Sequence, residues 1–268
     1  MKFGKRLDKE AVPAWRSYYV RYNLLKKRIK SFLETQGAIA TGAPQQQKPD
    51  LFANNNQARK KFDDLVEQEI HRVKFFYEKI LLKLSTQTQE LQLRKERLSV
   101  QLYSTKVQTK NRMKIDDEVF NLAQEYVVVG NEFVNLYKYL ELNLTGIRKI
   151  LKKFEKKARL ANLQSGVPML RKLQEDKNSQ IAVMLQELSD HRAMTPVINN
   201  VTDSVLSLQR ILERQGTLNS GRDEDFFMKK NLCSQIESLL VNVIEAKMRM
   251  ESANSFLSFL SSQAMVCV

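Results

Sequence analysis

The chain has 268 residues, with 44 Lys and Arg against 30 Asp and Glu, so its formal net charge at pH 7 is +14. Only eight Gly and five Pro occur, and long stretches rich in Leu, Lys, Glu and Gln predict an all-helical protein. Two Cys and two His cannot build a disulfide framework or a zinc site, so no metal or cofactor is expected. The first residues are not a secretory signal and no 18-residue apolar stretch occurs, so we expect no transmembrane segment and a cytoplasmic or nuclear location.

The excess positive charge is confined to two short segments. Residues 1–30 carry ten basic groups against two acidic ones, and residues 146–160 carry seven against one. The rest of the chain holds 27 of each sign and is therefore neutral. A requirement for solubility alone would spread the charge more evenly, so this concentration indicates an anionic partner.

Helical spacing of apolar residues predicts the first elements of the chain. Residues 2–10 are expected to form a short helix. Pro13 is expected to begin a second helix that runs from Ala14 to about Leu33, so that the two make an N-terminal helical hairpin. Residues 34–57 are dominated by Gly, Ala, Pro, Gln and Asn, a composition that predicts a flexible loop.

Two long amphipathic helices are predicted next, over residues 62–102 and 116–160, and both are long enough to pair as the spine of a bundle. Gly and Pro at residues 165–168 predict a break. Shorter helices are then expected over residues 169–189, 196–215 and 223–260. The predicted fold is therefore all-α: a helical bundle with two long antiparallel helices, an N-terminal helical hairpin and shorter C-terminal helices.

The second basic segment has two different faces when it is drawn as a helix. Lys149, Lys152, Lys153 and Lys156 fall within an arc of roughly 100°, and apolar residues cover the opposite side. Like charges three and four residues apart repel each other, and a polyanion would neutralise them. A lysine face that is merely solvated explains the pattern about equally well, so this segment alone does not decide between the two interpretations.

The first basic segment contains a lysine in an unusual position. Lys26 falls on the apolar side of the helix predicted after Pro13, within about 40° of Tyr22 and about 60° of Ile29. Its ammonium must then reach water or meet an anion, and the Tyr22 hydroxyl could donate to the same anion. The alternative is a lysine at the edge of the stripe whose ammonium extends into water. If the two basic segments lie side by side, their lysines form one patch that suits a compact ligand with several phosphates.

Two stretches of the sequence resemble the SPX domain family. The opening Met1-Lys-Phe-Gly-Lys, followed by Pro13-Ala-Trp-Arg-Ser-Tyr-Tyr-Val-Arg-Tyr, resembles the N-terminal hairpin of the family. The stretch Leu144-Thr-Gly-Ile-Arg-Lys-Ile-Leu-Lys-Lys-Phe-Glu-Lys resembles its most diagnostic segment, with mild departures at Ile147 and Glu155. The resemblance covers an SPX-like domain over about residues 1–200, and residues 201–268 are expected to be a helical C-terminal extension.

The resemblance implies a sensor without enzymatic activity that binds inositol polyphosphates or pyrophosphates between the hairpin and the lysine-rich helix. It also implies that the ligand signals cellular phosphate status through a ligand-dependent protein partner, such as a transcription factor or a phosphate-handling protein, with no direct contact to nucleic acid. The residues that it assigns to the ligand are Lys2, Tyr22, Lys26, Lys149, Lys152, Lys153 and Lys156, with Lys30 as a secondary candidate.

Two other interpretations of the basic segments compete with this one. A basic helical protein could bind nucleic acid, although the lysine-rich helix has few arginines and no interleaved aromatics for base stacking. It could also bind phosphoinositide headgroups at a membrane surface, although the sequence offers no second apolar or lipidated anchor. No P-loop, Gly-x-Ser-x-Gly motif or metal-ligand spacing supports an enzyme, so no catalytic residue is predicted.

Overall fold

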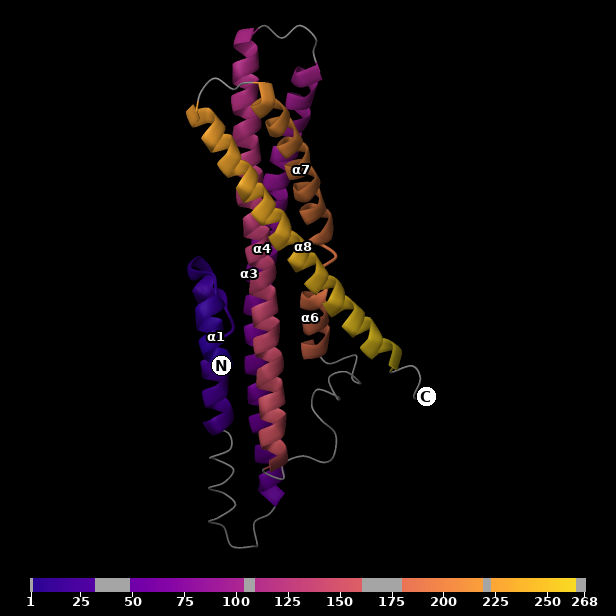
Figure 1. Ribbon diagram of the computed structural model, residues 1–268. Helices are drawn as coiled ribbons and strands as arrows, with labels where there is room; N and C mark the ends of the chain where they lie inside the picture. The colour runs from indigo at the N-terminus through magenta and orange to yellow at the C-terminus, as the bar shows by residue number, and fades with distance from the viewer. Residues whose placement is uncertain (1, 32–48, 104–108, 161–179, 219–222, 264–268) are drawn as a thin grey trace. The chain divides into compact units, whose positions relative to one another are not determined.

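The computed structural model describes residues 2–31, 49–103, 109–160, 180–218 and 223–263, and Figure 1 colours its elements along the chain. The regular elements in these ranges are all helical, which confirms the predicted all-α fold. They are α1 (Phe3–Glu10), the 3₁₀ helix η1 (Pro13–Tyr18), a helix at residues 22–31, α3 (Pro49–Tyr103), α4 (Thr109–Leu160), α6 (Gln180–Ser189), α7 (Thr195–Leu218) and α8 (Asp223–Gln263).

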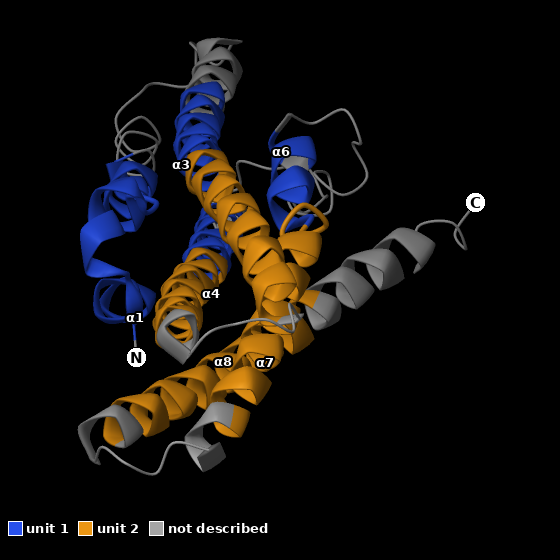
Figure 2. Cartoon of the chain, turned by 90° about the horizontal axis from the view of Figure 1, so that it is seen from above, with its two compact units in different colours: residues 1–77, 139–190, 259–268 blue, residues 78–138, 191–258 orange. Residues whose placement is uncertain are grey.

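The chain divides into two compact units, and both long helices contribute to each of them (Figure 2). Unit 1 comprises residues 1–77, 139–190 and 259–268, and unit 2 comprises residues 78–138 and 191–258. The units therefore do not follow one another along the sequence. The predicted boundary at residue 200 falls inside α7 and stays a prediction.

In unit 1, α3 and α4 run antiparallel, as predicted. Phe62 stacks on Phe154 with ring centroids 4.2 Å apart, and Phe76 packs against Tyr139 at 5.0 Å. Because the earlier residue of α3 pairs with the later residue of α4, the two helices point in opposite directions. Their facing apolar stripes form the core to which the N-terminal hairpin adds buried side chains, including Phe3, Leu7, Leu25 and Ile29.

In unit 2, the same two helices are again antiparallel, and ion pairs join Lys83 to Glu132 and Arg94 to Glu125. Helices α7 and α8 supply the remaining core of this unit. Gly130 of α4 permits a close approach of α8, since a Cβ at this position would lie 2.6 Å from Cδ2 of Leu239. Both helices cover the ranges expected for them, 196–215 and 223–260.

The helix predicted after Pro13 is divided at residues 19–21, so that η1 and helix 22–31 are separate elements. The backbone N–H of Val20, inside this interruption, donates to Oδ1 of Asn143 at 2.7 Å. A side chain of α4 thus satisfies a backbone group that would otherwise need a helical partner. The prediction of one continuous helix is wrong because apolar spacing does not register such a tertiary bond.

The predicted loop over residues 34–57 is wrong from residue 49 onward, because α3 begins at Pro49. Proline is accommodated at the first position of a helix, where its missing N–H would have no partner. The three consecutive asparagines at residues 54–56 are therefore helical despite their composition. Residues 34–48 lie outside the described residues, as do residues 161–179, which contain the predicted break and the predicted start of the next helix.

Candidate anion-binding site

The C-terminal part of α4 buries its apolar side and exposes its lysines, as predicted. Its apolar side chains are at most 2% exposed at Ile147, Ile150, Leu151 and Phe154. On the other side, Lys149, Lys152 and Lys156 are exposed and Lys153 is half-buried. The helix is therefore anchored in the core of unit 1 and presents a row of ammonium groups.

Helix 22–31 docks through Leu25 and Ile29, which are 0% and 1% exposed. These two side chains fill the buried stripe of the helix, and the side chain of Lys26 is exposed. The prediction that Lys26 lies on the core-facing stripe is therefore wrong, and its position is the edge of the stripe. Because the side chain of Lys26 is exposed, its position alone does not require an anion. Evidence for an anion there must come from the charged groups around it.

Phe3 connects α1, helix 22–31 and α4. Its ring meets the ring of Tyr22 edge-on with centroids 4.9 Å apart, and Nζ of Lys149 lies 4.8 Å from its centroid. An ammonium over an aromatic face is attracted by the ring quadrupole, which holds Lys149 toward the hairpin. Gly146 permits this packing, because a Cβ there would lie 3.1 Å from Cε1 of Phe3 and 2.9 Å from Cγ1 of Val20.

Lys26 of the first basic segment acts electrostatically on Lys153 of the second. Burial lowers the pKa of Lys153, and the ammonium groups of Lys26 and Lys157 lower it further. Burial also raises the pKa of the nearby Tyr22 hydroxyl. Within the described ranges, no acidic side chain forms an ion pair with Lys26, Lys149 or Lys153. Among the residues that the structure describes, the like charges of Lys26 and Lys153 are therefore not offset by an ion pair of either lysine.

The other predicted ligand residues lie on the same elements. Lys2 is exposed at the start of α1, and its carbonyl oxygen accepts the backbone N–H groups of the first turn. Lys152 and Lys156 are exposed on α4, and Lys30 is exposed on helix 22–31. Their assignment to a ligand stays a prediction.

The sequence analysis missed a set of polar side chains that bind the interruption between η1 and helix 22–31. Glu69 and Asn143 are both 0% exposed. Each occupies an apolar position of its long helix, since Glu69 comes one turn after Val66 and Asn143 one turn after Tyr139. A polar residue in a core stripe is unusual, so this signal can be read from the sequence.

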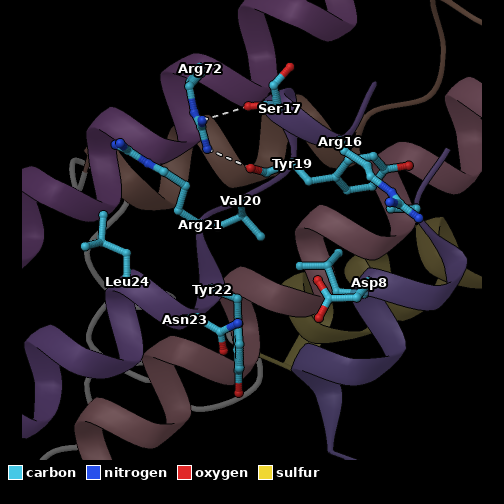
Figure 3. A pocket seen from close by; sticks show the side chains of 12 residues that line it. Asp8, Arg16, Ser17, Tyr19, Val20, Arg21, Tyr22, Asn23, Leu24 and Arg72 are labelled. Atoms are coloured by element: carbon cyan, nitrogen blue, oxygen red, sulfur yellow. Dashed lines mark hydrogen bonds between the residues drawn. The ribbon is translucent and has the colours of Figure 1, made fainter. Parts of the chain in front are cut away.

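Glu69 holds two arginines at this interruption. Its carboxylate accepts Nε of Arg21 at 2.7 Å and Nη2 of Arg72 at 2.7 Å. Arg72 also donates to the carbonyl oxygens of Ser17 at 3.0 Å and Tyr19 at 2.7 Å, as Figure 3 shows. Because the carboxylate is fully buried, two guanidinium partners offset the cost of removing it from water.

An open cavity of about 820 Å³ borders this arginine group and is lined by the side chains drawn in Figure 3. Two of its three arginines, Arg21 and Arg72, are already paired with Glu69. The cavity is thus distinct from the row of lysines on α4, although Tyr22 lines it as well.

Residues 1–125 match the family model of the SPX domain. The first 125 residues are thus similar to the SPX domain. The matched range contains α1, η1, helix 22–31 and α3, and it ends inside α4. Lys149, Lys152, Lys153 and Lys156 follow the matched range, so the match does not test their assignment to a ligand.

The relatives that match are longer proteins. An SPX domain-containing membrane protein of Oryza sativa subsp. indica is 26% identical over 272 residues, which cover 99% of this chain and 32% of the relative. A second protein of that description from rice is 30% identical over 157 residues, with coverage of 59% and 19%. One from Arabidopsis thaliana is 27% identical over 158 residues, with coverage of 58% and 19%. The chain spans at most about a third of the length of these relatives.

A solved structure is also similar to this chain. It is the SPX domain of Chaetomium thermophilum glycerophosphodiester phosphodiesterase 1 in complex with inositol hexakisphosphate. The TM-score is 0.48 at 19% sequence identity, and the match covers 78% of this chain and 99% of that chain.

The predicted cytoplasmic or nuclear location is contradicted by these relatives, which are named as membrane proteins. Among the described helices, none has a stretch long and apolar enough to cross a membrane. The predicted location was based on the absence of a membrane-spanning stretch from these 268 residues. That absence does not decide location when the chain spans about a third of the length of its rice relative.

Proposed function

We propose that this chain binds inositol polyphosphates or pyrophosphates at a lysine site, by which we mean Lys2, Tyr22, Lys26, Lys149, Lys152, Lys153 and Lys156. The observation that carries the proposal is the contact of the hairpin with the lysine-rich part of α4, where Nζ of Lys149 lies 4.8 Å from the centroid of the Phe3 ring and the charge of Lys26 lowers the pKa of Lys153. Like charges that are held together without a counter-charge cost free energy, and an anion between them recovers it. The SPX family match supports the same class of ligand.

The spacing of the lysines on α4 favours a compact ligand with several phosphates. With a rise of about 1.5 Å per residue, Lys149, Lys153 and Lys156 follow one another at about 6 Å and about 4.5 Å along the helix axis. Each contact of an exposed ammonium with a phosphate is weak and screened by salt. Affinity therefore requires one ligand that engages several of these ammonium groups at once. Inorganic phosphate cannot do so, because it carries a single phosphorus centre.

The ligand would also couple the hairpin to α4, which makes the domain a sensor. In the free protein the ammonium groups of Lys26 and Lys153 repel each other, and in the complex both face the same polyanion. We propose that this change alters the surface offered to a protein partner, such as a transcription factor or a phosphate-handling protein, and so reports phosphate status. Partner capture that is identical with and without inositol hexakisphosphate would contradict this part of the proposal.

Isothermal titration calorimetry in parallel with inositol hexakisphosphate, inorganic phosphate and duplex DNA tests the ligand class. The expected order is tight binding of inositol hexakisphosphate, much weaker binding of inorganic phosphate and weak, strongly salt-dependent binding of DNA. Tight DNA binding together with no response to inositol hexakisphosphate would overturn the proposal in favour of a nucleic-acid-binding protein.

A triple variant tests the location of the site. Changing Lys149, Lys153 and Lys156 to Ala should weaken binding of inositol hexakisphosphate by about a thousandfold, since the loss of each charge-assisted contact weakens binding by about tenfold. The helix should remain folded because alanine is a good helix former. The matched control changes three exposed lysines of unit 2 to Ala: Lys79, Lys114 and Lys138. It removes the same charge and should change the affinity only slightly, whereas equal losses in both variants would indicate a nonspecific charge effect.

A further inference from the structure

The interruption between η1 and helix 22–31 is bound from both long helices of unit 1. We infer that Asn143 and Glu69 are positioning residues for the lysine site, because they fix the point at which helix 22–31 begins and so place Lys26 opposite Lys153. The inference rests on the proposed function and deepens it. It names residues that set the geometry of the ligand site without touching the ligand.

Side chains hold one backbone group at each of five consecutive residues, 17–21. On the α3 side, Arg72 donates to the carbonyl oxygens of Ser17 and Tyr19. A carboxylate oxygen of Glu69 accepts the backbone N–H of Arg21 at 2.8 Å. On the α4 side, the Tyr139 hydroxyl donates to the carbonyl oxygen of Tyr18 at 2.9 Å. The side-chain oxygen of Asn143 accepts the backbone N–H of Val20. Each of these five residues is bonded either to α3 or to α4, so the turn has little freedom to shift.

Asn143 gives the arrangement its register along α4. Its Nδ2 donates to the carbonyl oxygen of Tyr139 at 2.7 Å, and its Oδ1 accepts the N–H of Val20 at 2.7 Å. The bond to Tyr139 fixes the orientation of the Asn143 amide, so its Oδ1 points in one direction, toward the backbone N–H of Val20. Asn143 lies ten residues before Lys153 on α4, about 15 Å along the helix axis. One helix therefore carries both the anchor of the hairpin and the lysine that Lys26 must face.

Repulsion gives such an anchor a role. The charge of Lys26 lowers the pKa of Lys153, and neither lysine has an ion pair within the described residues, so their like charges oppose the docking of helix 22–31 on α4. Burial of Leu25 and Ile29 opposes this separation but is nondirectional. Hydrogen bonds at the start of helix 22–31 are directional, so they set its rotation about its own axis and its position along α4, whereas burial alone does not. A site that is assembled before the ligand arrives binds more tightly, because the ligand does not have to order it.

A purely structural role predicts something different. Removal of a buried hydrogen bond would then lower the thermal stability of unit 1 and leave the relative contributions of the lysines unchanged. In a positioning role, the contribution of Lys26 depends on Asn143, whereas that of Lys153 does not, because Lys153 is carried by α4 itself. Double-mutant cycles separate these two cases.

The test is isothermal titration calorimetry of inositol hexakisphosphate with the full chain and its Asn143→Ala, Lys26→Ala and Lys153→Ala variants, singly and in pairs. Asn143→Ala should weaken binding about tenfold, the effect of losing one charge-assisted contact. In that background, Lys26→Ala should weaken binding by less than about twofold further, whereas Lys153→Ala should retain its full effect. If Lys26→Ala has the same effect with and without Asn143, the positioning inference is overturned.

Two further proteins keep the result interpretable. Tyr139→Phe retains the ring and removes only the hydroxyl, which donates to the carbonyl oxygen of Tyr18 at 2.9 Å and to that of Val73 at 3.4 Å, so it replaces Asn143→Ala if that variant does not fold. Ser204→Ala removes a buried hydroxyl of unit 2, which accepts a bond from Nζ of Lys95 at 2.8 Å. It should lower the melting temperature without changing the affinity. The proposed function fails if the wild-type protein does not bind inositol hexakisphosphate, or if Lys26→Ala does not weaken its binding. If folded Asn143→Ala binds inositol hexakisphosphate as tightly as the wild type, only the positioning inference is overturned.

Discussion

Lys153 is the residue at which the two basic segments meet. Its pKa is lowered by burial and by the ammonium groups of Lys26 and Lys157. Each of these influences disfavours the charged form of the amine in the free protein. A bound polyanion acts in the opposite direction, because it favours the charged form and raises the pKa. Binding and protonation of Lys153 are therefore linked.

This linkage predicts proton uptake on ligand binding at alkaline pH. Below the ordinary lysine value of 10.5, part of the Lys153 population loses its proton in the free protein and regains it in the complex. Uptake should therefore grow, and affinity should fall, as the pH rises toward that value. Calorimetric titration with inositol hexakisphosphate at about pH 9, in two buffers of different ionisation enthalpy, measures the uptake.

The control for this prediction is Lys153→Arg, whose guanidinium stays charged over the whole range. This variant should bind with less proton uptake than the wild type, because its side chain has no proton to regain. Equal uptake by the two proteins would show that a group other than Lys153 takes up the protons.

The helices of the hairpin illustrate what apolar periodicity can and cannot predict. It predicts α3 and α4 well, because each buries one long stripe against the other. It does not predict the interruption at residues 19–21, because the bonds that form it come from side chains 48 and 123 residues away in the sequence. It also places Lys26 wrongly, since the stripe of helix 22–31 is already filled by Leu25 and Ile29.

The contact between α4 and the hairpin predicts an effect of Gly146→Ala on ligand binding. The new Cβ would lie 2.9 Å from Cγ1 of Val20 and 3.1 Å from Cε1 of Phe3, so the hairpin must move away from α4. That movement separates Lys26 from Lys153, and inositol hexakisphosphate should bind about tenfold more weakly, as for the loss of one charge-assisted contact. Titration calorimetry measures the loss.

Gly130→Ala is the matched control, because its Cβ meets the side chain of Leu239 in unit 2. This variant should change the melting temperature and leave the affinity within about twofold of wild type, since ΔΔG values at distant sites are usually independent. An equal loss of affinity in both variants would mean that general destabilisation, and not the position of the hairpin, weakens binding.

For the whole molecule, the distribution of charge shows how much of the site can be predicted from sequence. All of the excess charge lies in two segments, and this fact alone indicates an anionic ligand. The sequence does not reveal which lysines approach each other, because that depends on the register between helix 22–31 and α4. Asn143 and Glu69, which set the register, attract attention only as polar residues in apolar stripes.

The division into two units predicts that the ligand protects only one of them. At a ligand concentration of 100 times Kd, binding should stabilise the domain by about 2.7 kcal/mol and raise its melting temperature. Amide hydrogen exchange should slow in α1, in helix 22–31 and around residues 146–157, and stay nearly unchanged in α7 and α8. Slower exchange confined to unit 2 would place the ligand elsewhere.

The central claim is that Lys26 and Lys153, from segments far apart in the sequence, contact one ligand in a single site. Calorimetric titration of inositol hexakisphosphate into Lys26→Ala, Lys153→Ala and the double variant tests it most directly. The account predicts that each single change weakens binding about tenfold and that the double variant binds more weakly than either single variant, because each lysine makes its own contact with the ligand. Wild-type affinity in Lys26→Ala, with a loss in Lys153→Ala alone, would contradict a site shared by the hairpin and α4.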